Sequence, residues 1–393
     1  MATHLSAPGV YIAETPVAAH PIEPAAPTAV TAFVGHTADG PVHQPVAVDS
    51  ASVFERVFSR RSADSPLSLA VGSFFDNGGQ QALVVRLPPG ATAQTAWAPT
   101  DKAARQRREG VYALDGVDFN LLCLLPLPGH DLGVRTWARA AAYCRQRRAV
   151  LLVDAPADWQ DTATTVNGMA ALRGAVGTLA AAHAAVYHPR LQIPDPSNRK
   201  ATLDVAPCGA VAGVIARTDA QHGLWKAPAG KEARLAGVTG LTRSLERTAL
   251  ETLNPQGLNI LQTLPGQGPV IWGARTLAGT DTDASDWKYL PVRRLALHIE
   301  RSVLQGTRWV VFEPNDETLW ARLRAAVGDF LFDLFRRGAF QGGHPGQAYL
   351  VRCDRSTTSA DDIAHGRVQL LIGFAPLKPA EFVTVRFTLR CAV

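Results

Sequence analysis

The stretch FNLLCLLPLPGHDLGVRTWARAAAYCRQRRAVLLVD, residues 119–154, decides the fold class. Residues 119–125 form a short apolar run that Pro126 ends. Residues 134–148 have the composition of a helix, and a second apolar run follows at 150–154. A strand, a helix and another strand in this order are typical of strands joined by a crossover helix. We therefore predict a largely parallel or mixed sheet that is covered by helices.

The same alternation extends to both sides of this stretch. We predict further elements as follows: strands at 29–35, 82–87 and near 184–187, a short helix capped by Asp49-Ser50, and helices at 67–76 and from about residue 162. Residues 90–110 are polar and rich in alanine, which indicates a surface excursion. Beyond residue 194 we predict long loops that contain glycine and proline, with strands at 258–264 and 270–272.

A second compact unit is predicted to start near Lys288. Its elements are expected in this order: a helix at 292–305, a strand at 308–312, a long helix capped by Asn315-Asp316-Glu317 and ending at Gly338, and strands at 347–352, 368–374 and 382–391. The predicted fold class is therefore α/β (α+β), with two domains, mixed sheets covered by helices, and extended arms at both ends of the chain.

The long helix of this second unit has an unusually wide apolar face. Two adjacent stripes of apolar residues span roughly 180°, against the ~100° of a surface helix; they are Leu319, Leu323, Ala326, Phe330 and Leu334, and Trp320, Val327, Leu331 and Phe335. We predict that core residues or another subunit pack on both sides of this helix. The remaining face carries Arg322, Asp329, Asp333 and Arg336, and the last two are spaced to form an ion pair.

Both ends of the chain have features of arms. The short run Val10-Tyr11-Ile12 is β-prone, and the four prolines between residues 16 and 27 exclude a helix. Near the C-terminus an alternating strand places Val383, Val385, Phe387 and Leu389 on one face. This stretch is explained equally well as the ordinary last strand of the second unit. Together, the two ends suggest arms that add strands to neighbouring subunits.

Composition excludes several classes of protein. Of the 393 residues 47% are hydrophobic and 19% are charged, against roughly 25% charged in a typical soluble domain. The surface is therefore either polar and uncharged or largely covered by partners. The five cysteines form no C-x-x-C pair, so neither a disulfide framework nor a thiolate zinc site is indicated. No signal peptide or membrane-spanning run is indicated, and we expect a cytoplasmic product.

Motifs typical of enzymes are absent from the sequence. We find no dinucleotide-binding fingerprint, phosphate loop, nucleophile elbow or H-E-x-x-H helix. Residues 281–286 begin like a calcium loop but lack its turn glycine, and the eleven histidines are scattered. The basic runs 105–108 and 145–148 are short and favour solvated helix faces over nucleic-acid binding. We assign no catalytic, cofactor or metal residue; an α/β enzyme of unknown reaction remains the alternative, and it predicts a pocket with converging titratable groups.

Ordered motifs along almost the whole chain resemble the tail sheath family of contractile phage tails, pyocin-like particles and extracellular injection systems. The motifs are Pro8-Gly9-Val10-Tyr11-Ile12, Ala32-Phe33-Val34-Gly35, Phe74-Phe75-Asp76-Asn77-Gly78-Gly79, Ala216-Arg217-Thr218-Asp219, Leu253-Asn254-Pro255, Trp272-Gly273-Ala274-Arg275-Thr276 and, most specifically, Gly306-Thr307-Arg308-Trp309-Val310-Val311-Phe312-Glu313-Pro314-Asn315-Asp316. One departure is Ser59, which stands where a glycine commonly follows the phenylalanine. The chain is also short, as expected for a sheath without large outer insertions.

The resemblance implies a structural subunit that forms stacked helical rings around an inner tube and contracts to drive the tube through a target envelope. It implies an N-terminal arm at 1–27, an outer domain at 28–276, an inner domain at 277–380 and a C-terminal arm at 381–393. The implied partners are further copies of the chain, the tube protein, and baseplate and terminal cap proteins, with no nucleic acid and no direct membrane insertion. Assembly is expected in the bacterial cytoplasm, as part of a phage tail or a phage-tail-like particle. Arg322, Asp329, Asp333 and Arg336 are candidate tube-facing residues.

Overall fold

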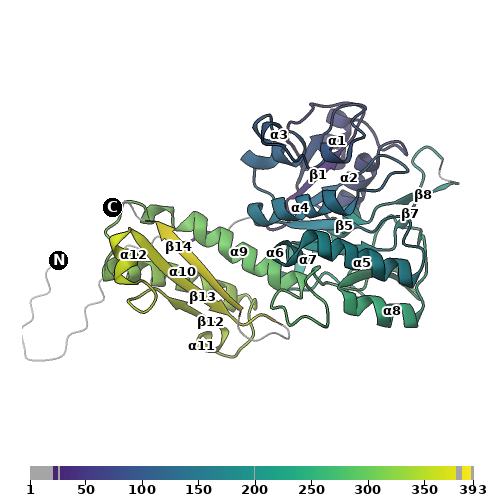
Figure 1. The fold of residues 1–393 in the computed structure, drawn as a ribbon. Helices are drawn as coiled ribbons and strands as arrows, with labels where there is room; N and C mark the ends of the chain where they lie inside the picture. Colours follow the sequence, from purple (N-terminus) through teal and green to yellow (C-terminus); the bar gives the residue numbers. More distant parts are fainter. Residues whose placement is uncertain (1–20, 25–26, 199, 378–382, 391–393) are drawn as a thin grey trace, which may run out of the picture. The chain divides into compact units, whose positions relative to one another are not determined.

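A computed structural model describes residues 21–24, 27–198, 200–377 and 383–390 of the chain, the last of these in their backbone (Figure 1). These residues fall into two compact units. The described part of the larger unit comprises residues 27–301 and 376–377, and that of the smaller unit comprises residues 21–24, 302–375 and 383–390. The boundary lies within helix α9 (Leu290–Gly306).

An eight-stranded sheet forms the centre of the larger unit. Its strand order is β11-β10-β6-β5-β4-β1-β3-β2. The strands are β1 (Thr31–Gly35), β2 (Val46–Val48), β3 (Ala82–Arg86), β4 (Leu121–Leu124), β5 (Val150–Asp154), β6 (Ala184–His188), β10 (Leu258–Leu264) and β11 (Gly268–Ile271). The inner pairs are parallel, whereas β2 and β11 pair antiparallel at the two edges. The predicted mixed sheet is confirmed.

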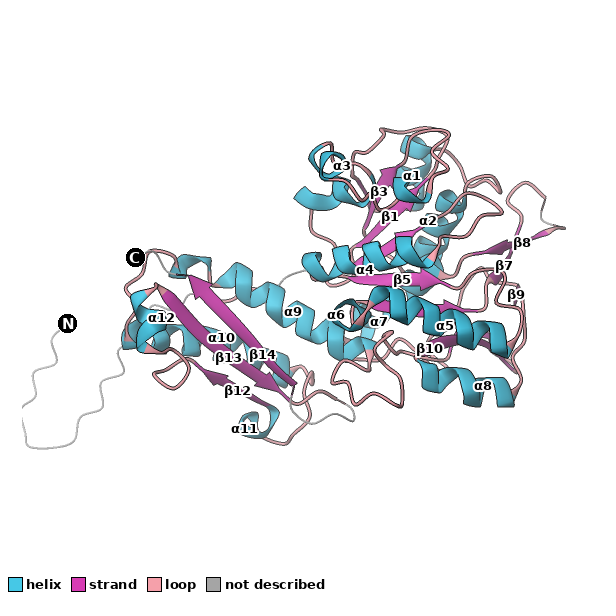
Figure 2. Cartoon of the chain, in the orientation of Figure 1, coloured by secondary structure: helices cyan, strands magenta, loops and turns pink. Residues whose placement is uncertain are grey.

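Helices cover both faces of this sheet (Figure 2). On one face lie α4 (Val134–Arg147) and α5 (Thr162–Val176), and on the other lie α2 (Pro66–Asp76) and α7 (Cys208–His222). The remaining helices of this unit are α1 (Ala51–Phe58), α3 (Lys102–Gln106), α6 (Thr178–Ala181), α8 (Arg247–Leu253) and three short 3₁₀ turns, η1 (Gln94–Ala96), η2 (Gly110–Gly116) and η3 (Asn254–Gln256). A small antiparallel sheet in the order β8-β7-β9 joins β7 (Leu191–Pro194) to β8 (Thr202–Val205) and β9 (Gly240–Leu241).

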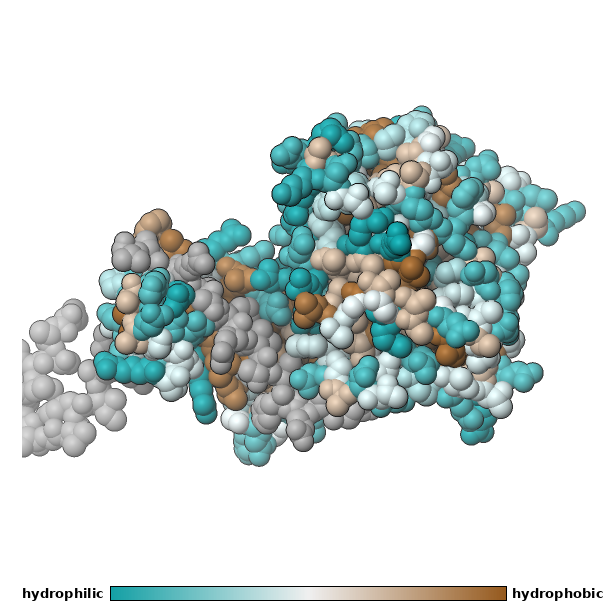
Figure 3. All heavy atoms as spheres, viewed as in Figure 1, coloured by the Kyte–Doolittle hydropathy of each residue, from teal (hydrophilic) through white to brown (hydrophobic). Residues whose placement is uncertain are grey.

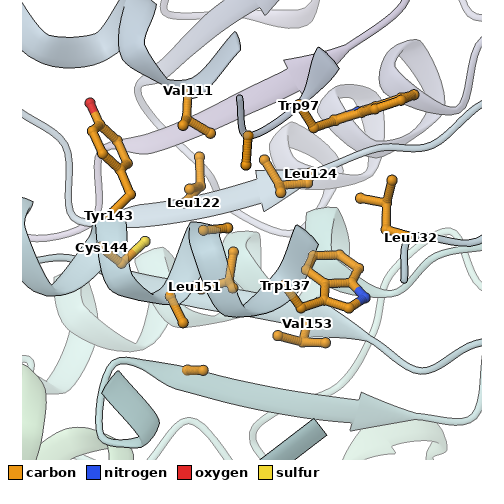
Figure 4. Packing of buried hydrophobic residues seen from close by; sticks show 14 of the residues in the cluster. Trp97, Val111, Leu122, Leu124, Leu132, Trp137, Tyr143, Cys144, Leu151 and Val153 are labelled. Carbon is orange, nitrogen blue, oxygen red and sulfur yellow. The ribbon is translucent and has the colours of Figure 1, made fainter. Parts of the chain in front are cut away.

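The packing between the sheet and α4 shows why the inner strands are continuous apolar runs (Figure 4). Trp137 and Cys144 of α4 lie against Leu122, Leu124 and Leu151, and all five are buried. The alternate residues of the same strands are buried on the opposite face, in a second apolar cluster with α2 and α7. Strands that are buried on both faces need apolar residues at every position, which is typical of parallel sheets.

Two glycines allow α7 to cross α2 at close range. A methyl group added to Gly209 would lie 2.2 Å from the carbonyl oxygen of Ala70, and one added to Gly213 would lie 2.4 Å from that of Phe74. Both contacts are with the backbone of α2, which no side-chain rotation can relieve. The two helices can therefore pack at this distance only because glycine has no Cβ atom.

We expect the substitution Gly209→Ala to destabilise the larger unit by at least about 1–3 kcal/mol, because the added methyl group forces α2 and α7 apart. The matched control is Gly174→Ala in α5, where an added methyl group meets nothing within 4 Å. That change is expected to stabilise the unit by about 0.4–1 kcal/mol, because alanine restricts the unfolded chain. Denaturant-induced unfolding measures both. Equal effects of the two substitutions would contradict this account.

Two predictions for the larger unit are wrong. The region after residue 194 was expected to be loops, yet it contains α7, whose residues 208–216 are all buried. A helix that is buried all round has no polar face, so it lacks the amphipathic pattern that marks a helix. The expected surface excursion at 90–110 is partly core, because Trp97 and Ala98 are buried and the indole of Trp97 donates a 2.9 Å hydrogen bond to the carbonyl of Leu125.

The smaller unit contains an antiparallel sheet and a long helix. The sheet has the order β12-β13-β14 and joins β12 (Tyr349–Arg352), β13 (Arg367–Phe374) and β14 (Val383–Arg390). Helix α10 (Glu317–Arg336) packs against β12, and α11 (Pro345–Ala348) and α12 (Ala360–Ala364) complete the unit. Asp316 caps α10 as predicted, since its carboxylate accepts a 2.8 Å hydrogen bond from the amide of Leu319.

The predicted strand at 308–312 is wrong. Residues Arg308–Val310 form a 3₁₀ helix, η4, which is followed by a turn. Val310 is buried, but Val311 and Phe312 are exposed. The run is apolar and β-prone, but Phe312 has a φ of 78° and lies in the left-handed region, which a strand does not use.

Candidate assembly surfaces

The predicted C-terminal arm forms the edge strand β14 of its own unit. Val383, Val385, Phe387 and Leu389 stand opposite Phe374, Ile372, Leu370 and Val368 of β13 in an antiparallel register. Beyond β13, the sheet continues only through the four-residue β12 in the part of the chain that the structure describes. The backbone of β13 thus provides an eight-residue template for this strand. The other predicted arm residues, Val10, Tyr11 and Ile12, lie outside the described residues.

The four candidate tube-facing residues share the polar face of α10. Asp329, Asp333 and Arg336 are exposed, whereas Arg322 is half-buried. Arg322 pairs with Glu313 at 2.9 Å, and its guanidinium lies 4.5 Å from the ring centre of Trp309. The predicted ion pair between Asp333 and Arg336 is not formed among the described residues, because both side chains point into solvent, where such pairs contribute little. The opposite, apolar face of α10 is buried as expected.

The loop before α10 carries the most exposed aromatic residue of the described chain. Phe312 is 83% exposed and Val311 is 45% exposed. At φ 78°, the backbone of Phe312 adopts the left-handed conformation, which costs a non-glycine residue roughly 1–2 kcal/mol. A bulky residue in this conformation is uncommon. This loop and the exposed face of α10 belong to the same unit.

A buried ion pair fixes the start of the larger unit, where the proline-rich N-terminal segment ends. The guanidinium of Arg294 in α9 donates to both carboxylate oxygens of Asp219 in α7, at 2.8 and 2.6 Å. The hydroxyl of Thr28 donates to the same carboxylate at 2.6 Å, and its carbonyl accepts from Arg294 at 3.1 Å. The side chains of Arg294 and Asp219 are 4% and 6% exposed. Three distant segments are thereby joined directly before β1.

Three buried titratable groups in the larger unit test the enzyme alternative. Burial lowers the pKa of His183 and of His188 to about 4, and it raises the pKa of Asp154 to about 6. His183 precedes β6, whereas Asp154 and His188 lie at the opposite, carboxyl ends of β5 and β6. Because side chains alternate along a strand, Asp154 shares its face with Leu152 and His188 shares the other face with Val186. The three groups do not converge.

The stability of the larger unit is expected to depend on pH through His188. Its two ring nitrogens have no hydrogen-bond partner among the described residues, so the folded protein keeps this imidazole neutral. The unfolded chain protonates it near pH 6.5, and its contribution to stability is therefore complete above pH 6.5 and is lost as the pH falls towards 4. Asp154 has the opposite effect on the pH dependence of stability. Its carboxyl group binds a proton more readily in the folded state, so its contribution to stability falls as the pH rises towards 6.

The substitution His188→Leu isolates this contribution. Between pH 6.5 and 4 we expect the free energy of unfolding of the variant to depend less steeply on pH than that of the wild type, by up to about 1.4 kcal/mol per pH unit. Urea unfolding at half-unit pH intervals provides the measurement. Parallel curves for the two proteins would show that His188 is not held neutral by the fold.

Other classes of site find little support in the described residues. These residues contain no group of three histidine, cysteine or acidic side chains placed to hold a metal ion. None of the helices that the structure describes has the length and apolar character to cross a membrane. On the face shown in Figure 3, hydrophilic residues are interspersed with smaller apolar patches. The low charged fraction is thus accompanied by apolar residues at the surface, among them Leu179, Trp272, Phe312, Phe332 and Leu377.

Two family models match the chain in consecutive segments. The model of the phage tail sheath protein central domain matches residues 101–277, and that of the phage tail sheath C-terminal domain matches residues 282–390. Together they cover more than half of the chain. The chain belongs to the phage tail sheath family. The predicted membership is thus confirmed, and the enzyme alternative receives no support.

Relatives and solved structures agree with this assignment. A protein of Pseudomonas aeruginosa (strain UCBPP-PA14) described as a prophage major tail sheath protein is 27% identical over 287 residues, which are 71% of this chain and 68% of the relative. The anti-feeding prophage helical sheath in its contracted state is 28% identical, with a TM-score of 0.74 and coverage of 98% of this chain and 99% of that chain. The sheath complex of the extracellular contractile injection system PVC, also contracted, is 26% identical, with a TM-score of 0.74 and 98% coverage of both chains.

Sequence reasoning missed two features of this sheath subunit. The sequence did contain a signal for one partner of the ion pair between Arg294 and Asp219. Arg294 shares a helix face with Leu290 and Leu297, and a charged residue on an apolar face indicates a buried, paired charge. No feature of the sequence identified its partner, Asp219, which lies 75 residues earlier. The exposure of Phe312 also had no signal, since an apolar residue in an apolar run favours burial. Ser59, the noted departure from the family pattern, has a φ of 103°, which explains why glycine suits this position.

Proposed function

We propose that this chain is the subunit of a contractile sheath that polymerises helically around an inner tube and contracts to drive that tube through a target envelope. The observation that carries the proposal is the likeness, over 98% of the chain, to two sheaths solved in the contracted state. The stroke needs no bound cofactor, because the free energy is stored in the packing of many identical subunits. Baseplate and terminal cap proteins bind the ends of the polymer.

The domain bounds form part of this proposal. We infer an N-terminal arm at 1–27, an outer domain at 28–276, an inner domain at 277–380 and a C-terminal arm at 381–393. The inner domain contains α10 and would face the tube through Arg322, Asp329, Asp333 and Arg336. The exposure of the last three side chains supports this assignment, since a docking face has to be accessible before assembly.

The arms are proposed as tethers between subunits. Val10, Tyr11 and Ile12, and the strand at 383–389, would add strands to sheets of neighbouring copies. The pairing of β14 with β13 supports this role, because it shows that the C-terminal strand fits the backbone of a sheet edge in this fold. Strand pairing keeps copies attached while rigid domains reorient. We place assembly in the bacterial cytoplasm, and the finished sheath in a phage tail or a phage-tail-like particle.

Negative-stain electron microscopy of the purified full-length chain, alone and with its tube protein, tests the proposal. Helical polymers with a central channel are the expected result. A protein that stays monomeric at all concentrations, with and without the tube, would contradict it. Charge reversal at Asp333 and Arg336 tests the tube-facing assignment separately: polymers should still form, but they should no longer enclose tubes.

A further inference from the structure

Two adjacent apolar residues of the smaller unit are exposed and form a candidate binding surface. Phe312 and Val311 are 83% and 45% exposed, and they directly follow the 3₁₀ helix η4. The backbone of Phe312 is left-handed, at φ 78°, and its side chain is exposed, whereas Val310 two residues earlier is buried. An exposed aromatic side chain of this kind is a candidate contact residue, because aromatic residues, phenylalanine included, are enriched in the cores of protein interfaces.

A groove of matching character lies on the larger unit. It has a volume of about 800 Å³ and is lined by rings and aliphatic side chains, Trp225, Trp272, Tyr289, Val292, Leu295 and Leu377. Trp272 is 44% exposed and Leu377 is 42% exposed, so the groove is open to solvent. Its apolar lining and its size suit the insertion of an aromatic side chain together with a neighbouring valine.

The charges at the two places are complementary. Glu313, Asp316 and Glu317 follow Phe312 within five residues, and no basic residue occurs between Trp309 and Ala321. The groove is lined by His222, Lys226 and Arg275, and none of its lining residues is acidic. These groups already have partners within the subunit: Glu313 pairs with Arg322 and Glu317 with Arg355, whereas Lys226 and His222 lie near Glu232 and Arg275 pairs with Asp281. The acidic side chains that follow Phe312 and the absence of acidic side chains from the groove lining favour an approach of the loop to this groove.

We propose that Phe312 and Val311 of one copy insert into the Trp272 groove of a second copy. A projection and a groove at different places on the same chain form a heterologous contact, and repeated heterologous contacts that do not close generate helical polymers. The inference rests on the proposed sheath function, which requires a helical polymer, and it adds a side-chain contact to the strand pairing of the arms.

The first test is the critical concentration for polymerisation of the full-length chain. Phe312→Gly removes the projection and suits the left-handed backbone, so the subunit should fold at least as well as the wild type. We expect its critical concentration to rise at least about tenfold. Trp272→Ser should have a similar effect, and the double variant should be little worse than either single one, because both remove the same contact. The matched control is Leu179→Ser, which removes an apolar side chain that is 74% exposed elsewhere.

A cross-linking experiment identifies the partner. Val311→Cys and Ala227→Cys, which leave Phe312 and Trp272 in place, are made in separate chains, with Cys391 replaced by serine; Ala227 lines the groove, and the other four cysteines are buried. Mixing the two variants under mild oxidation should give a disulfide-linked heterodimer within the polymer, whereas neither variant alone should give one. The inference would be overturned if Phe312→Gly polymerised at the critical concentration of the wild type. It would also be overturned if the effects of the two single substitutions on the critical concentration added up in the double variant.

The outcomes for the contact and for the sheath function can be told apart. If the wild-type chain forms helical polymers but the mixed cysteine variants do not cross-link, the contact is wrong and the sheath function stands. If the wild-type chain forms no polymer with or without the tube, the proposed function itself fails. Polymers of Phe312→Gly that form normally but exclude the tube would assign Phe312 to the tube and also overturn the inference.

Discussion

Replacing Asp219 by alanine is expected to lower the free energy of unfolding of the larger unit by about 3–5 kcal/mol. The substitution leaves the guanidinium of Arg294 charged and without its carboxylate in a site where its side chain is 4% exposed. It also removes the acceptor of the Thr28 hydroxyl. A buried charge that loses its partner keeps the full cost of its desolvation, and this cost is the source of the large effect.

Two further variants separate the loss of the pair from the loss of side-chain volume. The double variant Asp219→Ala/Arg294→Met removes both charges, and it should recover most of the lost stability, because a buried pair is often no more stable than apolar residues of similar size. The control is Glu251→Ala, which breaks the exposed pair between Arg247 and Glu251; that change should cost no more than about 0.5 kcal/mol. Urea unfolding below the critical concentration measures all three. A double variant as unstable as Asp219→Ala would contradict the role of the unpaired charge.

The ion pair also binds Thr28, at the end of the predicted N-terminal arm. Arg294 and Asp219 hold the backbone and the side chain of Thr28 at the point where the predicted N-terminal arm ends. We therefore expect Thr28→Val, which removes the hydroxyl with little change in volume, to weaken the anchor by about 1 kcal/mol and to leave the sheet intact.

The strands of the large sheet other than β2, which was missed, could be predicted because their signals are local. Apolar runs such as 121–124 and 150–154 are bounded by proline, glycine or charged residues, and buried parallel strands require such runs. The cap of α10 at Asp316 and the wide apolar face of that helix are also local features. Helix α7 was missed because its burial on all sides leaves no period to detect, and burial of this kind is decided by the packing of the whole unit.

The candidate surfaces could be predicted only in part. The polar face of α10 follows from helical spacing alone, so its exposed residues were correctly grouped. The partner of Arg294 could not be inferred, because the pair joins two helices that only the tertiary fold brings together. The exposed ring of Phe312 depends on a single left-handed residue, and the apolar composition of its neighbours favoured a strand instead. Backbone conformation at one position is beyond what composition and periodicity indicate.

Deleting residues 1–20 is expected to abolish polymerisation and to leave a folded monomer. The deletion leaves Ile22 in the chain, and this residue is buried beside Gly306 in the smaller unit. What the deletion removes is Val10, Tyr11 and Ile12, the β-prone run that we propose pairs with a neighbouring copy. Thermal unfolding should match that of the wild type, whereas sedimentation and negative-stain images should show no helical polymers.

Proline substitutions decide whether strand pairing, rather than the mere length of the arm, is responsible. Tyr11→Pro/Ile12→Pro removes two backbone N–H donors from the proposed strand, and a paired strand does not tolerate this loss. The matched control, Ala18→Pro/Ala19→Pro, adds the same two residues between Pro16 and Pro21, where the sequence already predicts an extended backbone that suits proline. The first variant should behave like the deletion and the second like the wild type. If both polymerise at the wild-type critical concentration, the N-terminal segment is not a strand-pairing tether, and cohesion of the polymer has to come from the C-terminal strand or from contacts between side chains.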